Sequence, residues 1–417
     1  MTSDPAQRQR QLRSALAPER WPLPLEALPP DTVLVGGAVR DGLLGRLPER
    51  PDLDLVVGEE AIGLARRLAR RWGGSCVVLD QERSIARLVV AGWTIDLARR
   101  AGACLDDDLA RRDFTVNAIA LPLAGGELVD PQGGLADLAA RRMVAIREAN
   151  LLDDPLRLLR GIRLACELDF SIAANSWAWI RRHHDRIGTV AGERVLAELE
   201  RLATSASGQR GLAQVLQAGL LEPWHGDADG AATALLEPLT PARASEAGLT
   251  PEESAAALPL ARLATVLDAE AIGRLHGSRR LQQRCQRLRS WRQRLSPGAS
   301  LPLPSPDGLP EAARLSLQRQ LETDLPALLL HLDPPVARIA LERWRDTEDP
   351  LFHPRPPLDG RRLQQQLALP AGPLLGQLLD HLTGERAFGR LPRQADEGRT
   401  LTLARSWLAE QSHPRHG

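Results

Sequence analysis

The feature that most constrains the fold is a change of hydrophobic pattern near residue 150. From residue 31 to about 147, short apolar and β-branched runs alternate with helical stretches such as Glu60–Trp72. After residue 150 strand patterns nearly vanish, and Leu/Ala/Arg segments place apolar residues three and four apart. Strands are expected at Thr32–Val35, Leu53–Val57, Cys76–Leu79, Leu88–Val90, Trp93–Leu97 and Val116–Leu121. The pattern predicts a small α/β head followed by an all-helical remainder.

A chain of 417 residues is too long for one ordinary core, so two to four domains are expected, and we divide the chain into four segments. Residues 1–30 are polar and then proline-rich, which is typical of a lead-in to the first strand. The head occupies 31–147, and helical segments occupy 148–222 and 223–417. The stretch 296–310, SPGASLPLPSPDGLP, is typical of a linker.

Composition argues against wholesale disorder and gives little indication of a partner. Hydrophobic residues make up 43% and charged residues 25%, which is typical of a folded, cored protein. The 53 basic and 53 acidic residues balance, so net charge does not indicate a nucleic-acid partner. The basic residues are all arginine, the better side chain for bidentate recognition of phosphates and base edges.

Cysteine usage and hydropathy point to the cytoplasm. Four widely separated cysteines without a CxxC pair argue against a zinc knuckle and a disulfide framework. No apolar run reaches the ~18 residues of a membrane span, and the first residues lack the apolar core of a signal peptide. We therefore expect a cytoplasmic protein without a membrane partner, and no protein partner is evident.

A glycine pair follows the first expected strand, in Val33-Leu34-Val35-Gly36-Gly37-Ala38-Val39-Arg40-Asp41. Gly36 and Gly37 would let backbone N–H groups approach an anion, and a helix N-terminus follows them. Arg40 could add a charge-assisted contact to a phosphate. The stretch matches neither GxGxxG nor GxxxxGK[ST], which argues against a standard dinucleotide-binding site and a P-loop. An ordinary strand-turn-helix is the alternative to phosphate binding.

Paired aspartates begin the second strand. Asp52 and Asp54 share one face of the strand, while Leu53 and its alternate neighbours enter the core. Adjacent carboxylates repel unless a cation neutralises them, and Mg²⁺ suits carboxylate oxygens together with substrate phosphates. Asp96, on another apolar run, is a candidate third carboxylate of the metal site. Solvated carboxylates at strand ends are the alternative.

Two further patterns carry charge beside apolar runs. Arg112 and Asp113 precede the run Val116–Leu121, where an arginine could meet a triphosphate or a ribose; surface charges flanking a strand are the alternative. Asp154 and Arg157 stand three apart on an expected helix and share a face, which offers an acceptor and donors for a base edge. An amphipathic helix with a salt bridge is the alternative there.

The triplet His183-His184-Asp185 raises the possibility of a histidine-aspartate metal phosphohydrolase. Such a site needs a further histidine well upstream, and His183 is the first histidine of the chain. This interpretation is therefore disfavoured.

Five motifs in order give the chain a family resemblance: LVGGAVRD, DLDLVV, RRDFTVNAIA, LVDPQGGLADL and DDPLRLLRGIRLA, within residues 33–170. Together they resemble the class II tRNA nucleotidyltransferase and bacterial poly(A) polymerase family. Weaker echoes lie at Val190–Val195 and in 358–395. The resemblance implies an α+β head of the DNA polymerase beta-like nucleotidyltransferase type, followed by an all-α neck (148–222) and an all-α body and tail (223–417).

The resemblance also implies roles for individual residues. Asp52 and Asp54 would be the catalytic metal ligands for Mg²⁺. The nucleotide would be bound by the glycine turn and by charged side chains of the head and neck: Gly36, Gly37, Arg40, Arg112, Asp113, Asp154, Arg157, Arg160 and Arg163. Of these, Asp154 and Arg157 would read the base. Arg163 would lie nearly opposite Asp154 on a straight helix, so its place in the pocket depends on the helix path. The family's usual Glu-Asp is Asp153-Asp154 here.

The implied function is addition of CMP, AMP or both, from CTP and ATP, to the 3′ end of tRNA by two-metal chemistry. Only Ala98 to Ala110 separate the fifth strand from the Arg-Arg-Asp motif. Full CCA-adding relatives usually carry a longer flexible loop there, so CC addition is favoured.

Several alternatives remain open. They are CCA addition, A addition, poly(A) synthesis, an inactive RNA-binding protein and a nucleotidyltransferase acting on a small molecule or a protein. The helical remainder would clamp tRNA through its arginines, and a solvated helix face is the other interpretation of that run. The arginines in question are Arg279, Arg280, Arg284, Arg287, Arg289, Arg292 and Arg294.

Overall fold

The computed structural model describes all residues except 1–3, 225–230, 299, 395 and 412–417. The chain divides into two compact units, one of residues 1–198 with 217–223 and the other of residues 199–216 with 224–417. Among the residues that the structure describes, no helix combines the length and apolar character needed to cross a bilayer.

The first unit is built on a six-stranded mixed sheet with the order β3-β4-β5-β2-β1-β6. The strands are β1 Val33–Val35, β2 Leu53–Val57, β3 Ser75–Asp80, β4 Ile85–Val90, β5 Trp93–Arg99 and β6 Leu121–Pro122. Strands β2 and β5 pair in parallel, and the other neighbours are antiparallel. A short parallel pair, β7 Arg142–Met143 and β8 Ser171–Ile172, lies outside this sheet.

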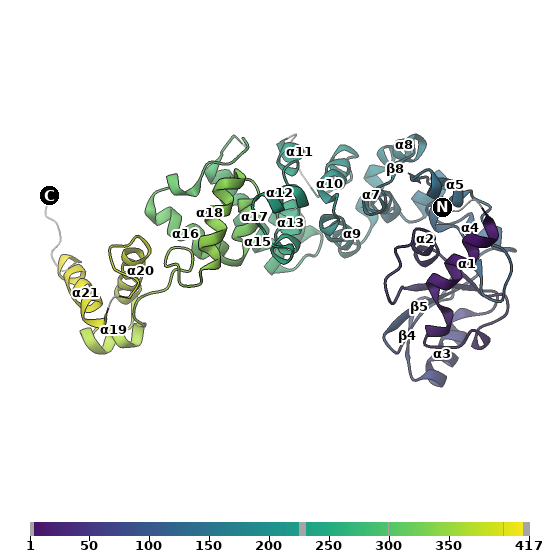
Figure 1. Cartoon of the computed structure of the whole chain (residues 1–417), viewed down its shortest axis with the longest axis horizontal. Coiled ribbons are helices and arrows are strands. Elements are labelled where there is room, and N and C mark those ends of the chain that lie inside the picture. The colour runs from purple at the N-terminus through teal and green to yellow at the C-terminus, as the bar shows by residue number, and fades with distance from the viewer. Residues whose placement is uncertain (1–3, 225–230, 299, 395, 412–417) are drawn as a thin grey trace. The chain divides into compact units, whose positions relative to one another are not determined.

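Helices cover the sheet and continue from it (Figure 1). They are α1 Pro5–Leu16, α2 Gly37–Leu43, α3 Ala61–Trp72, α4 Leu105–Leu109, α5 Gly134–Ala139, α6 Glu148–Asp153, α7 Leu156–Leu168, α8 Ala174–Arg182 and α9 Gly192–Thr204. Helix α3 packs against β3, β4 and β5. Its start is capped by the Glu60 carboxylate, which accepts from the N–H groups of Ile62 and Gly63, and it ends at left-handed Gly73.

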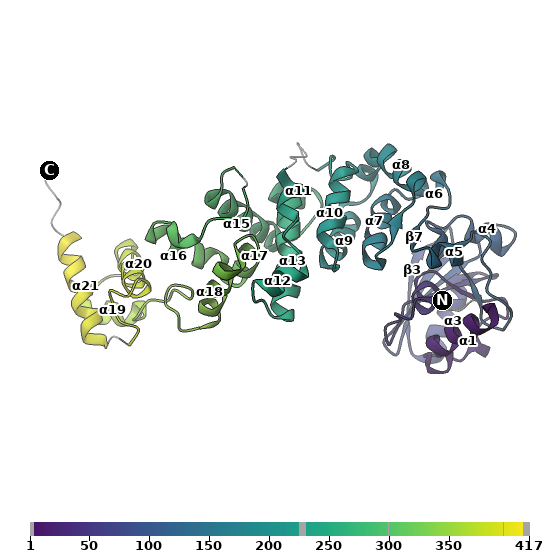
Figure 2. The ribbon, with the colours of Figure 1, turned by 45° about the horizontal axis from the view of Figure 1, so that its top comes forward.

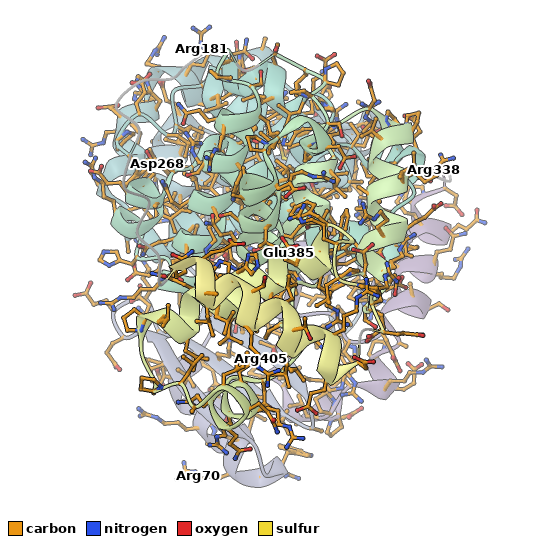
Figure 3. The ribbon with its side chains drawn as sticks, turned by 90° about the vertical axis from the view of Figure 1, so that its left-hand side faces the viewer. Arg70, Arg181, Asp268, Arg338, Glu385 and Arg405 are labelled. Carbon is orange, nitrogen blue, oxygen red and sulfur yellow. The ribbon has the colours of Figure 1, made fainter. Side chains whose placement is uncertain are left out.

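The second unit is helical. Its helices after α9 are α10 Gly208–Gln217, α11 Ala231–Leu236, α12 Pro241–Glu246, α13 Pro251–Val266, α14 Ala269–Arg274, α15 Arg279–Leu295, α16 Glu311–Leu321, α17 Leu325–Leu329, α18 Pro334–Arg345, α19 Gly360–Leu367, α20 Pro373–Ala387 and α21 Glu397–Gln411. Helices α11 and α12 lie beside α13 (Figure 2). The last three helices share a leucine cluster that includes Leu363, Leu378 and Leu382, while Arg405 of α21 is exposed (Figure 3).

The predicted fold class, an α+β head followed by a helical remainder, is confirmed. Three local predictions differ from the structure. Residues 5–16 form helix α1, capped by Asp4, with Leu12 and Leu16 buried. The run Val116–Leu121 is buried but contributes only the start of β6, because residues 115–117 form a 3₁₀ turn. Within the expected linker 296–310, Leu303 is buried and its N–H donates to the His331 carbonyl at 2.8 Å, so this position packs against the helical unit.

Candidate active site

A cavity of about 310 Å³ lies in the first unit, over the end of β1 and the exposed face of β2 and β5. Nine of the residues predicted for the site line it: Gly36, Gly37, Asp54, Asp96, Arg112, Asp113, Asp154, Arg157 and Arg160. Three other predicted residues, Asp52, Arg40 and Arg163, do not line it.

Strand pairing brings two carboxylates together at the floor of the cavity. Asp54 of β2 is the register partner of Asp96 on the parallel strand β5, so both side chains share one face of the sheet. Burial raises the pKa of Asp54 above its ordinary value of 3.8, and the charge on Asp96 adds to this, although the guanidinium of Arg112 opposes it. The site therefore holds a carboxylate whose negative charge is poorly compensated.

The glycine turn touches that carboxylate. Gly36 has φ +75°, and a Cβ at this position would lie 2.5 Å from Oδ2 of Asp54. A side chain at residue 36 would thus have to displace the carboxylate. Glycine is required here both by the backbone conformation and by the close approach.

The other two predicted metal ligands are placed differently. Asp96 accepts two hydrogen bonds from Arg87, each at 2.8 Å, so its charge is already paired. Asp52 precedes β2, is exposed and lies outside the cavity lining. In the described part of the chain no three His, Cys, Asp or Glu side chains converge as a metal-binding group. Asp54 and Asp96 are thus the two carboxylates that lie together over β2 and β5.

Arg40 does not reach the cavity. Its guanidinium is buried and donates to both carboxylate oxygens of Asp41, at 3.0 and 2.9 Å, and to Oδ1 of Asn117 at 2.6 Å. The neighbouring Asp41 thus occupies the donors that the sequence pattern suggested for a phosphate. Asn117 itself lines the cavity and was not singled out from the sequence, although it lies inside the RRDFTVNAIA motif.

Asp113 connects this group to the opposite wall. Its carboxylate accepts from Asn117 at 3.0 Å and pairs with Arg160 at 3.0 Å. Burial alone would raise the pKa of Asp113, but Arg160, Asn117 and Arg157 outweigh it and the pKa is lowered. Asp113 is therefore an ionised anchor that orients Arg160 beside the cavity.

Among the cations near Asp54, Arg112 has the largest lowering effect on the pKa of its carboxyl group. It pairs with Asp108 at 3.3 Å, and its buried Nε has no hydrogen-bond partner. A guanidinium with unused donors beside a cavity is suited to an incoming anion.

Asp154 and Arg157 meet where α6 ends and α7 begins. Arg157 donates from Nη1 to the carbonyls of Arg111 and Asn150, at 3.1 and 2.9 Å. The Asp154 carboxylate accepts from the Leu156 N–H and from a second residue missed in the sequence, Arg194 of α9, which also lines the cavity. Asp154 and Arg157 thus line one cavity, but not as the predicted helical pair: Asp154 has extended backbone between α6 and α7, and only Arg157 lies on α7.

Arg163 faces the other side of α7. It is buried and forms ion pairs with Glu198 of α9 and with Glu167, the latter at 2.6 Å. Three-residue steps fall short of a helical turn, so successive arginines rotate away from the cavity. The expected place of Arg163 in the pocket is not observed.

A second cavity, of about 480 Å³, adjoins the first and shares Arg112, Asp154 and Arg157 with it. Its wall includes the short connection between β5 and α4. Side chains of α4 fix that connection by hydrogen bonds. The N–H of Ala101 donates to the carboxylate of Asp108, and the N–H groups of Ala103 and Cys104 donate to the carboxylate of Asp107.

Comparisons with known proteins support the sequence resemblance. Residues 32–144 match the family model described as the poly A polymerase head domain, and residues 169–227 match the one described as the probable RNA and SrmB-binding site of polymerase A. A CC-adding tRNA nucleotidyltransferase of Synechocystis sp. is 45% identical over 211 residues, 51% of each chain. An A-adding tRNA nucleotidyltransferase of Deinococcus radiodurans is 40% identical over 204 residues, 48% of this chain and 46% of that one. The chain thus spans about half the length of the curated relatives it matches.

Solved structures share the fold over most of the chain. The Thermotoga maritima CCA-adding enzyme complexed with tRNA aligns with a TM-score of 0.69 at 21% identity, covering 90% of this chain and 91% of that one. The Bacillus stearothermophilus CCA-adding enzyme in complex with CTP aligns with a TM-score of 0.67 at 18% identity, covering 99% and 100%. Parts of the chain are thus similar to the head-domain and RNA-binding models of polymerase A, and the chain resembles CC- and A-adding tRNA nucleotidyltransferases in sequence and CCA-adding enzymes in fold.

Proposed function

We propose that this protein is a template-independent tRNA nucleotidyltransferase, which transfers CMP or AMP from CTP or ATP to the tRNA 3′ end and releases pyrophosphate. The observation that carries the proposal is one cavity lined by the Gly36–Gly37 turn, the Asp54 carboxylate and the Asp154–Arg157 pair. The glycine turn would bind a phosphate, Asp54 would bind a metal ion that assists the transfer, and Asp154 with Arg157 would bind the edge of a base. Its relatives of about 40–45% identity are named for CC and A addition. Because tRNA is the substrate, we place the enzyme in the cytoplasm.

Nucleotidyltransferases of this family generally use divalent metal ions. We propose Mg²⁺ here, held by Asp52 and Asp54, with Asp96 as a third ligand if Arg87 releases it. The residues fit such an ion, because Asp54 is a partly desolvated carboxylate with poorly compensated charge, and Mg²⁺ needs only one or two protein carboxylates beside substrate oxygens. When bound, the metal would supply activation of the 3′-hydroxyl and stabilisation of the leaving pyrophosphate.

The protein's own groups position the reactants. The backbone at Gly36 and Gly37 allows close approach of the triphosphate, and Arg112 and Arg160 neutralise its charge in the cavity. Asp113 holds Arg160 in place. We assign Arg40 an indirect role, since it braces the 3₁₀ turn through Asn117.

The nucleotide is selected by matching donors with acceptors. Cytosine and adenine each carry an exocyclic amino group, whereas uracil and guanine carry a carbonyl oxygen at the corresponding position. The Asp154 carboxylate can only accept a hydrogen bond and the Arg157 guanidinium can only donate one. The pair therefore favours CTP and ATP and leaves UTP and GTP with an unpaired carboxylate.

The pinned β5–α4 connection supports CC addition over the alternatives. The connection has only residues 100–104, and the carboxylates of Asp107 and Asp108 accept hydrogen bonds from three of its N–H groups. It therefore has little freedom to move, and a movement here would be needed to shift Asp154 and Arg157 from binding cytosine to binding adenine. Full CCA addition, A addition and poly(A) synthesis are the competing outcomes.

We propose that tRNA is held by the second unit, through the arginines of α15 that remain exposed: Arg279, Arg280, Arg287 and Arg294. The remaining three of the predicted set serve the fold instead. Arg284 binds Asp324, Arg289 donates to the carbonyls of Ala264 and Thr265, and Arg292 is buried.

The test offers tRNA lacking all three terminal nucleotides, tRNA ending in CC, and a non-tRNA oligonucleotide, each with CTP, ATP and Mg²⁺. Sequencing of the 3′ ends should show two cytidines on the first RNA and no addition to the other two. Robust addition of A would overturn CC specificity, and extension of the oligonucleotide would indicate a poly(A) polymerase. Asp54→Ala should abolish addition while tRNA binding persists; failure of the parent protein to extend any RNA would refute the enzyme assignment and favour an RNA-binding protein or transfer to another acceptor.

A further inference from the structure

We propose that Arg194 is a specificity-determining positioning residue, which acts by fixing the carboxylate of Asp154. This inference rests on the proposed function, because it concerns how the base-reading pair is held. Arg194 stands in the first turn of α9, lines the same cavity, and donates from Nη2 to Oδ2 of Asp154 at 2.9 Å.

The two base-reading side chains are supported independently. Arg157 is held by the carbonyls of Arg111 and Asn150, whereas Asp154 is held at Oδ2 by Arg194 and at Oδ1 by the Leu156 N–H, at 3.3 Å. The longer of these two bonds constrains the carboxylate less, so Arg194 supplies most of its orientation.

The contact leaves the carboxylate able to read a base. A carboxylate has about four lone-pair sites, and the structure shows two of them in use. An exocyclic amino group can therefore bind to Asp154 while Arg194 stays in place. A carbonyl oxygen of uracil would instead face an acceptor that is prevented from rotating away, which is the physical basis of rejection.

An ion pair between α7 and α9 holds α9 where Arg194 can reach Asp154. Glu198, four residues after Arg194 and on the same face of the helix, binds Arg163 of α7, and both side chains are nine-tenths buried. Breaking such a buried pair is costly, so it sets how α9 lies along α7. The place of Arg163 outside the cavity is explained by this role.

The experiment compares kcat/KM for CTP and for UTP on tRNA lacking its terminal nucleotides. Arg194→Ala and the less disruptive Arg194→Gln should lower the CTP-to-UTP ratio about tenfold, the loss expected for one charge-assisted contact. The KM for tRNA should stay unchanged. Arg201→Ala, an exposed arginine on the same helix, is the matched control and should leave the ratio unchanged.

A double-mutant cycle separates this role from general destabilisation. In an Asp154→Ala background, Arg194→Gln should cause no further loss of discrimination, because the side chain it positions is absent. An unchanged ratio in both single variants, or a further fall in the double variant, would overturn the inference. In either case the parent enzyme still adds cytidine selectively; loss of the proposed function itself would instead appear as a parent protein that adds no nucleotide.

Discussion

Replacement of Gly36 by alanine would test whether the glycine turn and the Asp54 carboxylate act as one unit. The added Cβ would lie 2.5 Å from Oδ2 of Asp54, whereas ordinary contact begins at 3.4 Å, so the carboxylate must move by about 0.9 Å. A displacement of about 1 Å at a reacting centre costs about 100-fold in rate, or about 2.7 kcal/mol. The backbone at φ +75° and ψ −143° adds about 1–3 kcal/mol to the loss of folding stability.

The assay measures kcat for CMP addition at saturating CTP and tRNA, together with the free energy of unfolding. Gly73→Ala is the control, because Gly73 also has positive φ, at +67°, but a Cβ there meets nothing within 4 Å. Gly73→Ala should lose about 1 kcal/mol of stability and keep its rate. A Gly36→Ala enzyme that is no less stable than this control and retains kcat within threefold would refute the argued contact with Asp54.

Three further predictions concern charge. Without metal, Asp54→Asn should raise the free energy of unfolding by about 1 kcal/mol at neutral pH, because burial raises the pKa of Asp54 and makes its charged form unfavourable in the folded protein. The gain should fade at acidic pH, where the parent carboxyl is protonated. A variant that melts at a lower temperature than the parent at neutral pH would contradict this. Arg262→Met should lose about 3 kcal/mol in denaturant titrations, because the buried guanidinium donates to four backbone carbonyls, while exposed Arg201→Ala should stay within about 0.5 kcal/mol. Exchange of Arg280 and Arg287 for glutamine should weaken tRNA binding and reduce its logarithmic salt dependence by about one for each phosphate that the protein no longer neutralises; an unchanged slope would exclude α15 from the RNA interface.

The candidate site is best predicted from the sequence where its residues are close neighbours in the chain. Gly36, Asp54, Asp154 and Arg157 all line one cavity, as the motifs predict. Gly36 and Asp54 are placed by short-range rules, a glycine turn after β1 and alternation along β2, whereas Asp154 lies in extended backbone just before α7 and not on the predicted helix. Their roles in catalysis and base reading remain predictions.

The structure differs from the sequence prediction where an arginine has more than one available partner. Arg40 follows a glycine turn, which suggests a phosphate contact, yet Asp41 and Asn117 bind it instead. Arg163 continues the spacing of the base-reading helix but is bound by Glu198. A guanidinium reaches several ångströms in any direction, so its partner depends on which carboxylate the fold brings near.

The sequence by itself determined the two fold classes along the chain, the strand that carries Asp54 and the helix that carries Arg157, because hydrophobic periodicity is a local property. Only the tertiary structure decided that Asp96 stands in register with Asp54 while being neutralised by Arg87, and that Arg194 supports Asp154. These pairings join residues that lie 9 to 42 positions apart in the chain. Strand register and helix packing bring them together, and no spacing rule within one element encodes such contacts.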